Sequence, residues 1–105
     1  MDYQAMQKIN NLLKAIETKI TAIQSEVEVP QPNVDKIQAD AHTIRILMAE
    51  VYDIVNSTGE SVSTITCSFF GENMKLSEIS MLLADFVNMC NDFYMESLKE
   101  SLKCY

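Results

Sequence analysis

Hydrophobic residues near the start of the chain recur at alternating intervals of three and four. The positions are Met6, Ile9, Leu13, Ile16, Ile20, Ile23 and Val27. This spacing places the side chains on one face of a helix that packs against a neighbouring helix. We therefore predict a helix over residues 3–28.

Two prolines interrupt the first helical pattern. Pro30 and Pro32 lack an amide proton and disfavour a helical conformation in the residue before them, so the helix cannot continue through this stretch. Asn33 is suited to cap the start of a second helix, and Asp35 then lies in its first turn, near the positive end of the helix dipole. So short a connection predicts that the two helices form an antiparallel hairpin.

A second apolar pattern starts at Val34 and keeps the same spacing over a long stretch. Its members are Val34, Ile37, Ala41, Ile44, Met48, Val51, Val55, Thr58, Val62, Ile65 and Phe69. Residues 56–59 resemble a loop, and residues 62–70 are rich in residue types typical of strands. Because the spacing stays in phase across both stretches, we predict a single helix over residues 34–70, weakened at Gly59. Replacing Gly59 by Ala is then expected to stabilise the protein by about 0.5–1 kcal/mol.

The last segment predicts a third helix over residues 77–103, with Gly71 ending the element before it and Ser77 as its N-cap. One broad apolar face contains Ile79, Leu82, Leu83, Phe86, Met89, Cys90 and Phe93. A second apolar strip contains Val87, Tyr94, Leu98 and Leu102. Two neighbouring helices do not cover this much apolar surface. Tyr94, Leu98 and Leu102 are therefore candidate partner-binding residues, through self-association or through contact with another helical protein.

Together these patterns predict an all-α fold, an elongated antiparallel three-helix bundle with a long middle helix. Residues 1–105 are expected to form a single helical domain. Only two Gly and two Pro are present, which fits long helices better than sheets with many turns.

Charge and composition exclude some classes of function. The chain carries 15 acidic and 8 basic residues, a net charge of −7, and has no cluster of Lys or Arg, so nucleic acid is not an expected partner. No apolar run is long enough to span a membrane. The three cysteines are widely separated and no signal peptide is recognisable, which indicates a reducing compartment such as the cytoplasm.

Motifs for catalysis are missing from the sequence. The one histidine, His42, falls beside the apolar pattern and is expected at the surface. No phosphate loop, nucleophile motif or metal-ligand spacing is present, so we predict no catalytic residues, no cofactor and no metal. A non-enzymatic scaffold or interaction module is the expected class.

Residues 69–79 read FFGENMKLSEI, and residues 82–89 add an apolar helix centred on Phe86. This stretch resembles the closing, post segment of the formin homology two domain of actin-assembly proteins, in which a long helix ends in an aromatic pair and a turn. The resemblance implies a cytoskeletal location, a formin chain as partner and actin as an indirect one. The parts of that domain that contact actin precede this segment and have no counterpart here, so this chain alone is not expected to nucleate actin.

An alternative interpretation needs no relation to formins. In this alternative, a small acidic helical chain acts as an adaptor or inhibitor that works through protein–protein contact. Both interpretations place the function in a surface that binds another protein.

Overall fold

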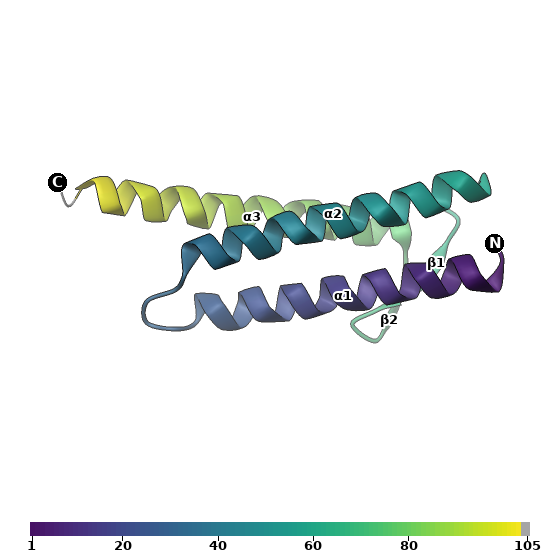
Figure 1. Cartoon of the computed structure of the whole chain (residues 1–105), viewed down its shortest axis with the longest axis horizontal. Helices are drawn as coiled ribbons and strands as arrows, with labels where there is room; N and C mark the ends of the chain where they lie inside the picture. Colours follow the sequence, from purple (N-terminus) through teal and green to yellow (C-terminus); the bar gives the residue numbers. More distant parts are fainter. Residues whose placement is uncertain (104–105) are drawn as a thin grey trace.

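The computed structural model describes residues 1–103 and is mostly helical, as the sequence predicts. The elements in chain order are α1 (Tyr3–Val27), α2 (Val34–Thr58), β1 (Thr66–Phe69), β2 (Glu72–Lys75) and α3 (Leu76–Lys103). The molecule is elongated, with extents of 56 × 21 × 17 Å, and α1 and α2 run antiparallel (Figure 1). The helices predicted over residues 3–28 and 77–103 agree with α1 and α3 to within one residue at each end.

The first two helices begin at side-chain caps. The Asp2 carboxylate accepts a hydrogen bond from the backbone N–H of Ala5 at 2.7 Å. The Asn33 side chain accepts one from the N–H of Lys36 at 3.1 Å, as predicted, and Asp35 lies in the first turn of α2. Each cap satisfies an amide that the helix itself leaves without an acceptor.

The long middle helix predicted over residues 34–70 is wrong. Helix α2 ends at Thr58, and Gly59 adopts the left-handed conformation with φ of 75°, which is a common way for a helix to end. The chain then crosses to a β-hairpin instead of continuing as helix. The resemblance to formins implied the same long helix ending at the Phe69–Phe70 pair, and that helix is absent here as well.

The correction reverses the expected effect of changing Gly59. An alanine side chain meets no atom within 4 Å there, so its cost comes from the left-handed backbone alone. We expect Gly59→Ala to destabilise the protein by about 1 kcal/mol, measured by urea unfolding. Gly59→Asn is the matched control and should cost less, because Asn tolerates this conformation better. A stabilised Gly59→Ala variant would contradict the end of α2 at this residue.

The hairpin turns in two residues, Phe70 and Gly71, with Phe69 paired to Glu72 across the strands. Both turn residues have positive φ, 50° and 79°, which is the pattern of a type I′ turn. Gly adopts this conformation freely, whereas Phe70 is strained there. The backbone N–H of Phe70 donates a hydrogen bond to Glu17 Oε1 at 2.6 Å, which ties the turn to α1.

Helix α3 starts one residue before the predicted N-cap Ser77. The N–H of Leu76 donates to the carbonyl of Ile65 at 2.9 Å, and the N–H of Ser77 donates to the carbonyl of Val62 at 3.1 Å. Backbone carbonyls of the segment between α2 and β1 therefore supply acceptors at the start of α3. These hydrogen bonds hold the segment that leads into the hairpin against the start of α3.

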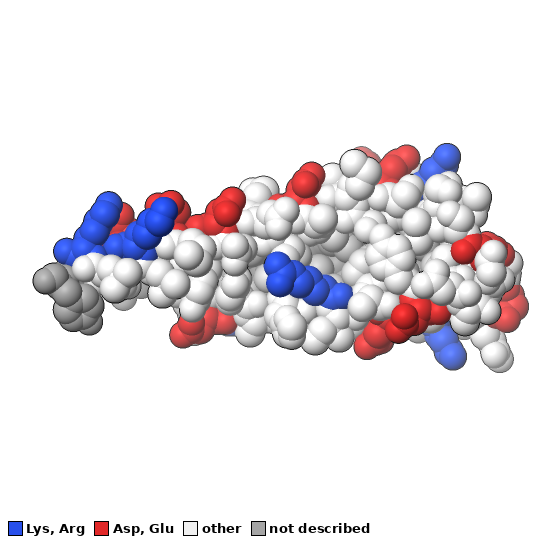
Figure 2. Space-filling model, turned by 90° about the horizontal axis from the view of Figure 1, so that it is seen from above, with Lys and Arg blue, Asp and Glu red and all other residues white. Residues whose placement is uncertain are grey.

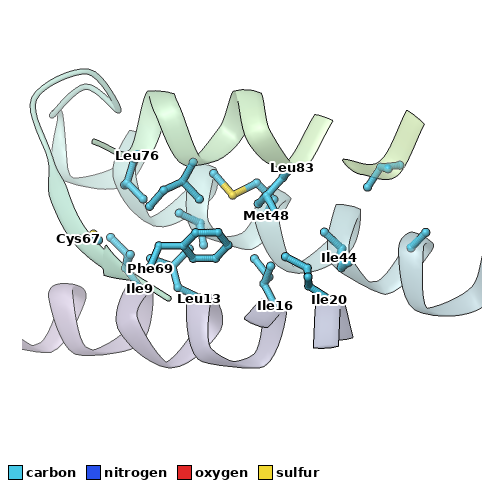
Figure 3. Packing of buried hydrophobic residues seen from close by; sticks show 14 of the residues in the cluster. Ile9, Leu13, Ile16, Ile20, Ile44, Met48, Cys67, Phe69, Leu76 and Leu83 are labelled. Atoms are coloured by element: carbon cyan, nitrogen blue, oxygen red, sulfur yellow. The ribbon is translucent and has the colours of Figure 1, made fainter. Parts of the chain in front are cut away.

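A single apolar core connects the helices and the hairpin (Figure 3). Ile65, Cys67 and Phe69 are buried while Thr66, Ser68 and Phe70 are exposed, the alternation of a strand with one face on a core. Figure 3 shows Cys67 and Phe69 close to labelled side chains of α1.

The helix packing departs from the predicted bundle. Helix α2 packs against both α1 and α3, but no Cα atom of α1 lies within 8 Å of one in α3. Strand β1 contacts both α1 and α3, so the hairpin stands between these two helices along part of their length. Beyond the hairpin, an apolar groove lies between the C-terminal part of α1 and the middle of α3.

Candidate protein-binding groove

The apolar groove between α1 and α3 has a volume of about 480 Å³. Its lining residues are Ile23, Gln24, Val27, Ile37, Phe86, Met89, Cys90 and Phe93. Gln24 is the one polar residue among them. Helix α1 supplies one wall of the groove and α3 supplies the other, and Ile37 of α2 lies between the two walls. In a larger bundle, a further helix would occupy this position.

The broad apolar face predicted on α3 divides into two rows. Ile79, Leu83 and Cys90 of this face are buried in the core, together with Val87, which the sequence placed on the second apolar strip. Leu82, Phe86, Met89 and Phe93, called the apolar row below, follow one another at steps of four, three and four, and the last three line the groove. Leu82 is 50% exposed and Met89 is 66% exposed, while Phe86 and Phe93 are partly buried.

The partner-binding residues predicted from the sequence lie elsewhere on α3. Tyr94 is partly buried, Leu98 is 40% exposed and Leu102 is 72% exposed, and none of them lines the groove. They lie in the C-terminal part of α3, and the C-terminal end of this helix extends past the loop joining α1 and α2 (Figure 1). The start of α2 lies beside the part of α3 just before Tyr94, because Gln38 Nε2 donates a hydrogen bond to Asn91 Oδ1 at 3.4 Å.

Sequence reasoning missed Leu82 and Met89 as surface residues because it placed them on the same face as Leu83 and Cys90. A helix face that broad is wider than a single neighbouring helix can cover. The seven-residue repeat of Leu82 with Met89 runs beside that of Leu83 with Cys90, and two adjacent repeats on one helix are typical of two contact faces.

A smaller hollow of about 350 Å³ lies between α2 and α3, with Arg45, Tyr52, Ser80 and Asn88 as its polar residues. Figure 2 shows a face of the molecule on which acidic side chains lie along the edges, and a basic side chain crosses a mostly uncharged middle. Tyr52 and Ser80 hydrogen-bond to each other across the two helices. Two of the polar groups thus satisfy one another, and the groove between α1 and α3 is the stronger candidate site.

Cys67 and Cys90 are free thiols in the core, and burial raises the pKa of both. Cys104, the third cysteine, lies outside the described residues. The raised pKa means that these thiols contribute stability that is present below the ordinary thiol pKa and is lost as the pH rises through the raised value.

We expect Cys67 and Cys90 to react with a thiol reagent on the order of a hundredfold or more slowly in the folded protein than in the unfolded one, because reaction needs local opening. The measurement is alkylation followed by mass spectrometry in a Cys104→Ser background. The same reaction in denaturant is the control. Rapid modification of Cys67 without denaturant would contradict the burial of β1 against the core.

Other kinds of site have no support within residues 1–103. No group of three or more His, Cys, Asp or Glu side chains in that range is arranged to hold a metal ion. None of the described helices combines the length and hydropathy needed to cross a membrane. His42 is exposed on α2, as predicted.

Comparison with protein-family models, curated proteins and solved structures gives no match to this chain. The function is therefore argued from the groove and the residues around it.

Proposed function

We propose that this chain is a non-enzymatic interaction module that binds a helix of another protein in the groove between α1 and α3. The exposed apolar row carries the proposal: Met89, which lines the groove with Phe86 and Phe93, is 66% exposed, and Leu82, one turn before Phe86 on α3, is 50% exposed. Contiguous apolar surface of this kind is typical of sites that bind proteins. A helix laid into such a groove contacts it through residues spaced three and four apart.

The shape of the molecule supports the same proposal. The finer architecture that we propose is an elongated antiparallel three-helix arrangement. In it α2 packs against both other helices, while α1 and α3 do not pack directly against each other. The hairpin occupies part of the side between α1 and α3, and a partner helix would complete the remainder. This corresponds to the adaptor or inhibitor interpretation of the sequence.

A formin-like role has less support. The helix that the resemblance implies over residues 34–70 is replaced by α2, a connecting segment and the hairpin. The aromatic pair lies on the hairpin, with Phe69 buried and Phe70 half exposed. We therefore place the actin-related role behind the adaptor role.

Two methionines on α3 provide a matched test of the proposal. Met89, in the apolar row, is 66% exposed, and Met81, outside the groove lining, is 70% exposed. We expect Met89→Glu to lose the proteins that co-purify with the tagged wild-type chain from its own cells, because a carboxylate is costly to bury in an apolar contact. Met81→Glu should retain them, with both variants shown to be folded by circular dichroism. The same bound proteins in both variants would contradict the proposal.

A further inference from the structure

Three acidic residues of α3 repeat with the same period as the apolar row. Glu78, Asp85 and Asp92 are spaced seven residues apart, and all three are exposed. Seven residues make two turns of helix, so these side chains share one face, called the acidic row below. Each acid lies three or four residues from Leu82 or Met89, which places the acidic row along the edge of the apolar row.

The acidic row has no basic partner within residues 1–103. The ion pairs of α3 are Glu96 with Lys99 and Glu100 with Lys103, each at 3.6 Å, near the C-terminal end of the helix. No Lys or Arg nitrogen of the described chain lies within 4.0 Å of the carboxylates of Glu78, Asp85 or Asp92. These three charges are therefore available to a partner that lies along the apolar row, and Asp85 and Asp92 are the two beside the part of α3 that lines the groove.

From this juxtaposition we propose that the occupant of the groove is a basic amphipathic helix. In paired helices, apolar residues repeat every seven positions, and charges that flank them select a partner of opposite charge. The apolar row and the acidic row supply this combination on α3. The partner would present an apolar stripe to the groove and Lys or Arg to Glu78, Asp85 and Asp92. The inference rests on the proposed function and specifies the chemistry of the partner.

A second copy of this chain fits the groove less well. Each copy carries a net charge of −7, and its α3 would bring the same acidic row to the contact. Like charges placed opposite one another at an interface disfavour association. Charge complementarity therefore favours a basic partner over self-association.

The length of the apolar row sets the size of the partner helix. From Leu82 to Phe93 the row covers about 17 Å along α3, which a helix of about three turns matches. A synthetic peptide of about 18 residues provides these turns and an additional turn at each end.

Three fluorescent peptides with the same leucine stripe test the inference, with Lys, Gln or Glu at the flanking positions. Fluorescence anisotropy should show the Lys peptide binding the full chain roughly tenfold or more tightly than the Glu peptide, since several partly exposed ion pairs together reach that size. The difference should shrink at high salt. Asp85→Lys combined with Asp92→Lys should reverse the preference.

Glu50→Lys combined with Asp53→Lys is the matched control. Both acids are exposed on α2, and the double variant changes the net charge of the chain by the same amount. It should keep the preference for the Lys peptide, which separates local recognition from attraction to an acidic protein as a whole. Reversal in this control as well would overturn the inference.

Other outcomes separate the inference from the proposed function. Equal binding of the Lys and Gln peptides, lost in Met89→Glu, would leave the groove as a helix-binding site but overturn the basic partner. Failure of the Lys peptide to bind would overturn the basic partner, and the co-purification comparison of Met89→Glu with Met81→Glu would still decide the proposed function. Self-association of the wild-type chain that Met89→Glu abolishes would identify a second copy as the occupant and overturn the inference.

Discussion

Replacing Phe69 by alanine is expected to lower the free energy of unfolding by about 3–5 kcal/mol. Phe69 is 5% exposed and is the last residue of β1, and its ring lies among labelled core side chains in Figure 3. Removing the ring leaves a cavity where the hairpin packs between α1 and α3. Because small domains have total stabilities of about 5–15 kcal/mol, this loss would remove a large part of the stability of the protein. Urea unfolding followed by circular dichroism measures the loss.

Phe70→Ala is the matched control for the neighbouring ring. Phe70 is half exposed, and its ring meets Phe69 edge to face with centroids 4.9 Å apart. Its removal loses this contact, worth about 0.5–1.5 kcal/mol, while the strained turn remains. Equal losses in the two variants would contradict the register of the hairpin.

Replacing Leu76 by alanine is expected to cost about 2–5 kcal/mol. Leu76 is fully buried at the first position of α3, and its N–H donates to the carbonyl of Ile65. The side chain therefore fills the core at the point where the hairpin meets the helix. Thermal and urea unfolding of the variant measure the loss.

Leu82→Ala is the control on the same helix. Leu82 is half exposed in the apolar row, so its truncation should cost less than about 1 kcal/mol while weakening partner binding. The contrast separates residues that hold the fold together from residues that leave apolar surface in water. A loss as large as that of Leu76→Ala would show that Leu82 belongs to the core and that α3 is rotated.

The positions of the first and third helices could be predicted from the sequence because their apolar spacing is long and regular. Prolines fixed the end of the first pattern, and Asn33 marked the start of the second. These signals are local, and the structure keeps them: the predicted cap at Asn33 is formed.

The hairpin was missed because four residues is a multiple of the strand period and also close to one helical turn. Ile65 and Phe69 are four apart, so both periods place them on one face. Cys67 decides between the two, because Ile65, Cys67 and Phe69 are all buried while Thr66 and Ser68 are exposed. This alternation, with Gly59 before it and Gly71 at the turn, was present in the sequence and outweighed by the apparent phase of the apolar positions.

The groove could not be predicted from the sequence because it depends on the distance between α1 and α3, which no local pattern of residues determines. The hairpin enters between α1 and α3, and beyond it an apolar groove remains between the C-terminal part of α1 and the middle of α3. Tyr94, Leu98 and Leu102 were expected to bind partners because they were counted as surplus apolar surface. The structure locates a comparable surplus earlier on α3, in the apolar row beside the groove.

Thiol footprinting of the groove tests most directly whether a partner helix binds there. Met89→Cys and Met81→Cys, each in a Cys104→Ser background, place exposed thiols inside and outside the groove. The reaction rate with a maleimide is compared between the purified chain and the chain bound to the proteins that co-purify with it. We expect binding to slow the reaction at position 89 by roughly tenfold or more, as burial of a thiol does, and to leave position 81 unchanged. Equal rates at position 89 in the free and bound chain would contradict a partner in the groove.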